Sequence, residues 1–153
     1  MTGLHDADLY RLTYLSASRA AMPRTELDAI LEASRTNNSR RAVTGLLLYH
    51  DAQFFQALEG PKAQVEEAFA IIKRDPRHSG CLVLESRPVA ARFFDRWSMG
   101  YRSADDLSAG QKQSFLELAS VRGQYAGRDA AGDARTRILM DSFLSSLRDL
   151  DLP

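Results

Sequence analysis

Alternating apolar and polar side chains, the period of a β-strand, mark the first part of the chain. Residues 9–15 alternate in this way, whereas residues 43–50 are apolar on both faces, which predicts a strand covered on both sides. A tight turn at residues 51–52 leads into a third strand over residues 53–59. The second and third strands are therefore expected to form a hairpin.

A spacing of three and four residues between apolar positions predicts two helices beside these strands. The first is expected to begin near Pro23 and to end near Asn37 and Asn38. The second follows Gly60-Pro61 and is closed by Asp75-Pro76, because a residue before proline is disfavoured in the helical conformation. One face of the first helix consists of Leu27, Ile30, Leu31 and Ser34, and the apolar stripe of the second consists of Val65, Ala68, Phe69 and Ile72.

Two further strands are predicted over residues 81–86 and 93–101. The resulting order, β-α-β-β-α-β-β, is typical of an α+β, ferredoxin-like sheet with one added strand and two helices on one face. Two C-terminal helices follow, capped by Ser108 and by Asp133. The last helix carries an apolar stripe of Met140, Phe143, Leu144 and Leu147, and we expect the C-terminal helices to pack on the opposite face of the sheet.

Composition narrows the class of protein. The chain has 153 residues with 20 basic and 20 acidic side chains, so its formal net charge is zero and favours neither nucleic acid nor an anionic membrane surface. The apolar stretches are too short to span a bilayer, and residues 1–8 lack a signal-peptide pattern. The single cysteine, Cys81, excludes an intrachain disulfide and favours a cytoplasmic location.

Gln56 breaks the apolar pattern of the third strand. Phe54, Gln56 and Leu58 share one face, and the two flanking residues mark that face as interior. A buried primary amide has two donors and an acceptor to satisfy, and each unpaired group costs on the order of 1–3 kcal/mol. Such a departure from the local pattern is typical of a functional site.

Tyr14, Asn37 and Asn38 are also polar residues at positions expected to face the same interior. Taken singly, the tyrosine is an ordinary core residue and the asparagines are helix C-caps. Together with Gln56 they provide one phenol and three amides between two helices and a sheet, which suits a flat heteroaromatic ring with donors and acceptors on its edge. The sequence has no glycine-rich phosphate loop and no metal-spaced cluster of cysteine and histidine.

Six blocks of sequence, in order, resemble the BLUF family of flavin-based blue-light sensors. They are LYRLTY at 9–14, ASRTNN at 33–38, VTGLLLY at 43–49, FFQALEG at 54–60, RDPRH at 74–78 and RFFDRWSM at 92–99. The resemblance implies a BLUF flavin-binding domain over residues 1–102 and a C-terminal helical extension over residues 103–153, as in short single-domain members without a separate output domain. It also implies a photoreceptor that is not an enzyme.

The resemblance further implies a noncovalent flavin, usually FAD, with FMN also open. Tyr14 matches the photochemical electron donor, and Gln56 matches the glutamine that links this tyrosine to the flavin. Light rearranges the Gln56 amide, because rotation or tautomerisation exchanges donor for acceptor at nearly constant shape. The remaining matches are Asn37 and Asn38 as flavin contacts, Ile30 and Ile72 as residues that sandwich the ring, Arg77 near the ribityl phosphate, and Trp97 and Met99 as the signal relay.

The chain departs from the family at Ile71, where several members carry a basic residue or histidine near the phosphates, and this departure keeps FMN open beside FAD. A downstream signalling protein is expected as partner, and a homo-oligomer as the assembly. Two alternatives are a light-independent ferredoxin-like module that binds another small ligand and a small enzyme of acylphosphatase type.

Overall fold

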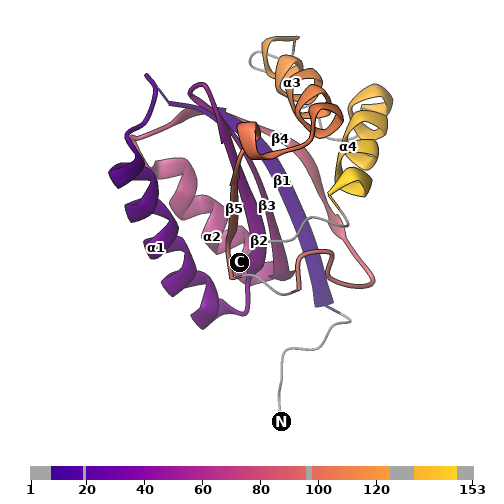
Figure 1. Ribbon diagram of the computed structural model, residues 1–153. Helices are drawn as coiled ribbons and strands as arrows, with labels where there is room; N and C mark the ends of the chain where they lie inside the picture. The colour runs from indigo at the N-terminus through magenta and orange to yellow at the C-terminus, as the bar shows by residue number, and fades with distance from the viewer. Residues whose placement is uncertain (1–7, 19, 96–97, 125–132, 148–153) are drawn as a thin grey trace.

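The described residues form a five-stranded sheet with the strand order β4-β1-β3-β2-β5 (Figure 1). The computed structural model describes residues 8–18, 20–95, 98–124 and 133–147. The three inner strands pair antiparallel, as does β4 with β1, whereas β5 runs parallel to β2. The strands are β1 (Leu9–Ala17), β2 (Thr44–His50), β3 (Gln53–Pro61), β4 (Ser79–Pro88) and β5 (Gly100–Ser103).

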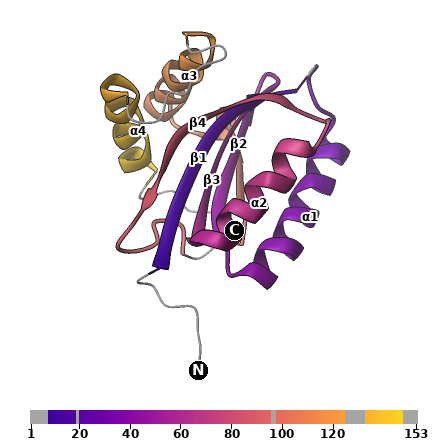
Figure 2. The same cartoon turned by 180° about the vertical axis from the view of Figure 1, so that it is seen from behind.

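Helices cover both faces of this sheet (Figures 1 and 2). Helices α1 (Arg24–Arg41) and α2 (Lys62–Arg74) lie on one face. A short 3-10 turn, η2 (Ala104–Asp106), leads from β5 to α3 (Ala109–Gln124), which packs with α4 (Ala134–Ser146) on the other face. The predicted ferredoxin-like plan, with the C-terminal helices opposite α1 and α2, is therefore confirmed. No helix in the described part of the chain is long and apolar enough to cross a membrane.

Two apolar cores lie on the two sides of the sheet. Beneath α3 and α4, Phe55 and Leu48 of the sheet meet Phe143, whose ring centroid lies 5.3 Å from that of Phe55. Beneath α1 and α2, Leu47 and Leu58 belong to the second core. Strand β2 supplies side chains to both cores, which explains why its sequence is apolar on both faces.

The predicted caps of the C-terminal helices are present. Ser108 Oγ accepts the Gln111 backbone N–H at 3.1 Å, and Gln111 Oε1 accepts the Ser108 N–H at 3.0 Å, so the two residues form a reciprocal capping box. Asp133 accepts the backbone N–H of Thr136 at 2.9 Å. Both caps satisfy amide groups that a helix N-terminus otherwise leaves unpaired.

The predicted end of α1 at Asn37 and Asn38 is wrong. The helix continues to Arg41, and its C-cap is Ala42, which takes the left-handed conformation with a φ of 56°. Asn38 lies inside the helix, and its side chain forms a tertiary contact: Nδ2 donates to the backbone carbonyl of Ser98 at 3.1 Å. A second correction is that β4 begins at Ser79 and ends at Pro88, beyond the predicted residues 81–86.

The fifth strand is much shorter than predicted. Residues 93–95 do not belong to it, and β5 begins only at Gly100. The backbone N–H groups of Phe93 and Phe94 donate to the carboxylate of Glu59, at 2.8 and 2.7 Å, in place of a neighbouring strand. The apolar side chains of this segment resemble those of a strand, but a buried acidic side chain binds its backbone.

Candidate functional site

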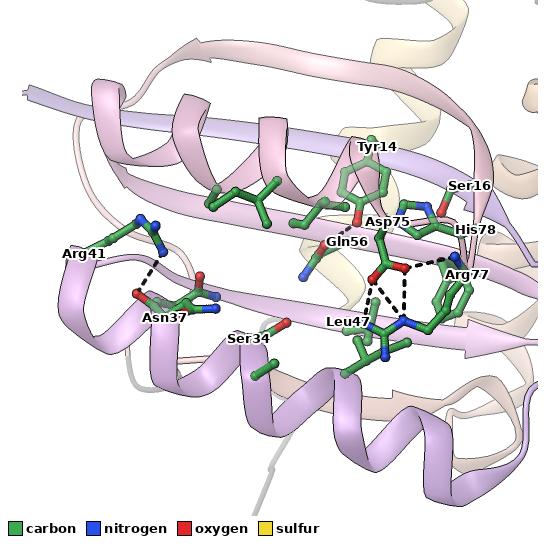
Figure 3. A pocket seen from close by; sticks show the side chains of 17 residues that line it. Tyr14, Ser16, Ser34, Asn37, Arg41, Leu47, Gln56, Asp75, Arg77 and His78 are labelled. Carbon is green, nitrogen blue, oxygen red and sulfur yellow. Dashed lines mark hydrogen bonds and ion pairs between the residues drawn. The ribbon is translucent and has the colours of Figure 1, made fainter.

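A pocket of about 750 Å³, part of it open to solvent, lies between α1, α2 and the sheet (Figure 3). Strands β1, β2 and β3 form its floor, and the segment after α2 closes one end. The lining includes Tyr14, Ser16, Ile30, Ser34, Asn37, Asn38, Arg41, Leu47, Phe54, Gln56, Ile71, Ile72, Asp75, Arg77 and His78.

The structure brings together nearly all of the predicted site residues. Seven of them line the pocket: Tyr14, Ile30, Asn37, Asn38, Gln56, Ile72 and Arg77. Met99 is buried directly behind Gln56. Trp97, the other predicted relay residue, lies outside the described residues.

The amide of Gln56 is hydrogen-bonded at both ends. Gln56 stands directly opposite Tyr14 in the pairing of β1 with β3, and the Tyr14 hydroxyl donates to Gln56 Oε1. At the other end, Gln56 Nε2 donates to Met99 Sδ at 3.3 Å. Only 3% of Gln56 is exposed, so the buried amide is stabilised by these partners. The three side chains form one continuous chain from β1 to the segment that precedes β5.

Tyr14 keeps its proton in this environment. Burial, and then the nearby Cys81 and Asp75, raise the pKa of the phenol well above its ordinary value. The ring packs against Phe69, with ring centroids 5.1 Å apart, and lies near His78. The hydroxyl therefore remains a hydrogen-bond donor toward Gln56 across the physiological pH range.

Arg77 is bound to Asp75. The Arg77 Nε donates to both carboxylate oxygens at 3.0 Å, and Nη2 donates to Oδ2 at 2.6 Å. The side-chain hydrogen bond from Arg77 lowers the pKa of Asp75, and the same bond raises the pKa of Arg77. This ion pair closes the end of the pocket near the start of α1, where Glu26 adds a further negative charge.

Several lining residues were missed by sequence reasoning. Ser16 is buried, and its Oγ is the one buried side-chain N or O atom without a hydrogen-bond partner in the described part of the chain. It lies two positions after Tyr14, so the same alternation that selected Tyr14 places Ser16 on the pocket face. Arg41 was missed because the predicted helix ended before it. Ser34 was assigned only to one face of the first predicted helix, and His78 appeared only as the last residue of the RDPRH block.

These side chains suit a flat, polar-edged ring. Ile30 and Ile72 supply apolar walls, Asn37 and Asn38 supply amides, and the unpaired Ser16 hydroxyl offers a further hydrogen bond to a ligand. The described residues contain no group of His, Cys, Asp and Glu that could hold a metal ion. The fold and the site define a ferredoxin-like module whose pocket suits an aromatic ligand beside a hydrogen-bonded tyrosine and glutamine.

Comparison with known proteins identifies the family. The model of the BLUF family, sensors of blue-light using FAD, matches residues 9–100, and the chain belongs to this family. The resemblance inferred from the sequence blocks is thereby confirmed, as is blue-light photoreception as the function.

The relatives include both long and short proteins. The photoactivated adenylate cyclase subunit beta of Euglena longa is 34% identical over 122 residues, which are 79% of this chain and 14% of that protein. The dark-state structure of the BLUF protein BlrB is 29% identical, with a TM-score of 0.73 over 94% of this chain and 98% of BlrB. Klebsiella pneumoniae BlrP1 with FMN and cyclic diGMP is 27% identical, with a TM-score of 0.63 over 90% of this chain and 34% of BlrP1.

Proposed function

We propose that this chain senses blue light with a noncovalent FAD held in the pocket between α1 and α2, and that it signals by rearranging the hydrogen bonds of Gln56. The observation that carries the proposal is the chain Tyr14–Gln56–Met99 at the floor of the pocket. When bound, a flavin supplies the absorption of blue light and accepts an electron.

Different lining residues would contact different parts of such a ligand. Ile30 and Ile72 sandwich the ring from the two helices, and Asn37 and Asn38 offer amides to its polar edge. Asn38 is already oriented, because its Nδ2 is bound to the carbonyl of Ser98. Arg77, fixed by Asp75, closes the end of the site. Asn38 and Arg77 are therefore preformed for binding.

Tyr14 is the electron donor in this proposal, and its hydroxyl proton already points at Gln56 Oε1. Gln56 is the switch, because turning its amide exchanges the donor and acceptor ends without a change of shape. In the arrangement seen here, Oε1 accepts from Tyr14 and Nε2 donates to Met99. A turned amide presents an oxygen to Met99 Sδ, which cannot donate, so the contact with Met99 is lost.

The output of this rearrangement is transmitted by the segment that contains Met99 and by the C-terminal helices. In this proposal, residues 1–102 form the sensing domain and residues 103–153 a helical extension that docks on it. The chain itself catalyses no reaction, and the signal passes to a separate signalling protein, with the receptor acting as a homo-oligomer. The lone Cys81 fits a reducing, cytoplasmic location.

FAD is proposed over FMN because the family model describes sensors that use FAD. The BlrP1 structure with FMN is a reason to test both.

The test uses the purified full chain. We expect a yellow protein with flavin absorption bands that shift reversibly to longer wavelength in blue light, and chromatography of the released cofactor should identify FAD. A protein that takes up no flavin, or whose spectrum does not respond to light, would contradict the proposed function.

A further inference from the structure

Two arginines line the pocket, and they lie at opposite ends of it (Figure 3). Arg41 closes α1 and reaches Glu67 of α2. Arg77 follows α2 and lies close enough to Glu26, in the first turn of α1, to interact electrostatically with it. The phosphate of a ligand could therefore bind at either end of the pocket, next to Arg41 or next to Arg77. The surroundings of these two arginines differ.

The end at Arg77 is already neutralised. Three side-chain contacts of 2.6 to 3.0 Å join its guanidinium to Asp75, and the Arg77 backbone N–H adds a fourth contact at 2.9 Å. With Glu26 nearby, the charges of these three residues sum to minus one. A phosphate at this end would have to displace a carboxylate from a well-formed ion pair and would be repelled by a second one.

The end at Arg41 is more open to a ligand. Its Nη1 lies 3.4 Å from the carbonyl of Asn37 and its Nη2 lies 3.3 Å from Glu67 Oε1, both long for a charged hydrogen bond. The Glu67 side chain is 58% exposed, so it can turn into solvent, whereas that of Arg41 is only 20% exposed. The Arg41 guanidinium is thus held at the pocket by its surroundings and retains donors for an anion.

We infer that Arg41 binds the phosphate of a flavin nucleotide and thereby selects FMN and FAD over riboflavin. This inference rests on the proposed function, since it assumes that a flavin occupies the pocket. Arg40 supports the site from the same turn: its Nη2 donates to Asn37 Oδ1 at 2.7 Å, which orients the amide beside Arg41. Ile71 of α2 also lines the pocket and is exposed, but its side chain is uncharged. The contact with the phosphate is therefore made from α1, by Arg41.

The experiment titrates riboflavin, FMN and FAD separately into flavin-free full-length protein and measures each affinity by flavin fluorescence. The variant Arg41→Gln removes the charge, Arg41→Lys keeps it, and Arg24→Gln removes an exposed charge from the other end of the same helix. Circular dichroism confirms that each variant is folded.

We expect Arg41→Gln to weaken FMN and FAD about 10- to 100-fold, the size of one lost charge-assisted hydrogen bond, and to leave riboflavin unchanged. Arg41→Lys should lose less, and Arg24→Gln should match the wild type. The loss should shrink as salt is raised, because the rim is partly open to solvent. Equal effects on all three flavins, or no effect, would overturn the role of Arg41, whereas a wild-type chain that binds none of them would overturn the proposed function itself.

Discussion

Gln56 Nε2 lies 3.3 Å from Met99 Sδ, so the amide in the pocket floor touches the segment that leads into β5. Phe94, in the same segment, is buried in the core beneath α3 and α4. The backbone of Phe93 and Phe94 is bound to Glu59, which lies three residues after Gln56 in β3. One short segment therefore contacts the site and the opposite face of the sheet.

Replacing Gln56 with leucine should abolish the light response and preserve the fold. The Gln56→Leu variant removes the amide with little change of volume, so flavin should still bind while the light-induced red shift is lost. Absorption spectra before and after blue light measure this. Gln53→Leu, at the start of the same strand and outside the pocket, is the matched control and should keep its red shift. A normal red shift in Gln56→Leu would show that the amide is not the switch.

Replacing Tyr14 with phenylalanine should remove the electron donor and keep the ring. Because the Tyr14→Phe variant retains the packing against Phe69, we expect flavin to remain bound and its fluorescence lifetime to increase. Time-resolved fluorescence on the purified variant measures this. An unchanged lifetime together with an intact photocycle would mean that another side chain supplies the electron.

The same variant should change how stability depends on alkaline pH. The pKa of Tyr14 is raised in the folded protein, so above about pH 10 the folded state keeps a proton that the unfolded state loses. The free energy of unfolding therefore falls as the pH rises, by up to about 1.4 kcal/mol per pH unit from this group. In denaturant unfolding between pH 8 and about 11, the free energy of unfolding should fall less steeply for Tyr14→Phe than for the wild type. The same pH dependence in both proteins would rule out this contribution from Tyr14.

Glu59 should be a strong determinant of stability. Its carboxylate is fully buried and accepts from Phe93, Phe94 and Arg11, the last at 3.2 Å. Glu59→Gln removes the charge and one acceptor, so we expect a loss of about 2–4 kcal/mol in the free energy of unfolding. Glu66→Gln, an exposed position on α2, should change stability by less than about 0.5 kcal/mol. If Glu59→Gln lowers the free energy of unfolding by no more than Glu66→Gln does, the contacts of Glu59 contribute little to stability.

Light should loosen β5 or the C-terminal helices. A turned Gln56 amide loses its bond to Met99, a change of about 0.5–1.5 kcal/mol, which can move a docking equilibrium roughly two- to tenfold. Amide hydrogen exchange of the dark and illuminated protein should therefore show faster exchange in β5, α3 or α4. Identical protection in these elements, with changes only in α1 and α2, would mean that the signal leaves by another surface.

The strand alternation and helix periodicity predicted the sheet, its covering helices and most of the pocket. They succeeded because a polar residue on an apolar face, as at Gln56 and Tyr14, is visible in one sequence. They failed where a tertiary contact replaced a local one. Asn38 resembles a helix cap, but its amide binds Ser98, and α1 continues past it to Arg41, which brings a charge to the pocket. The carboxylate of Glu59, distant in sequence, likewise takes residues 93–94 out of the predicted strand.

The shortness and position of β5 have a mechanical consequence. This strand holds to the edge of the sheet by four residues paired with β2 alone, and Tyr101 packs on the side of the pocket. A slip by one residue would exchange the two faces of β5, and a slip by two residues would put Ser103 or Met99 at the position of Tyr101, so only the present register keeps Tyr101 packed on the pocket side. We therefore expect β5 either to keep this register or to separate from β2, and a response transmitted through it to be all-or-none in each molecule rather than graded with the strength of the contact at Met99.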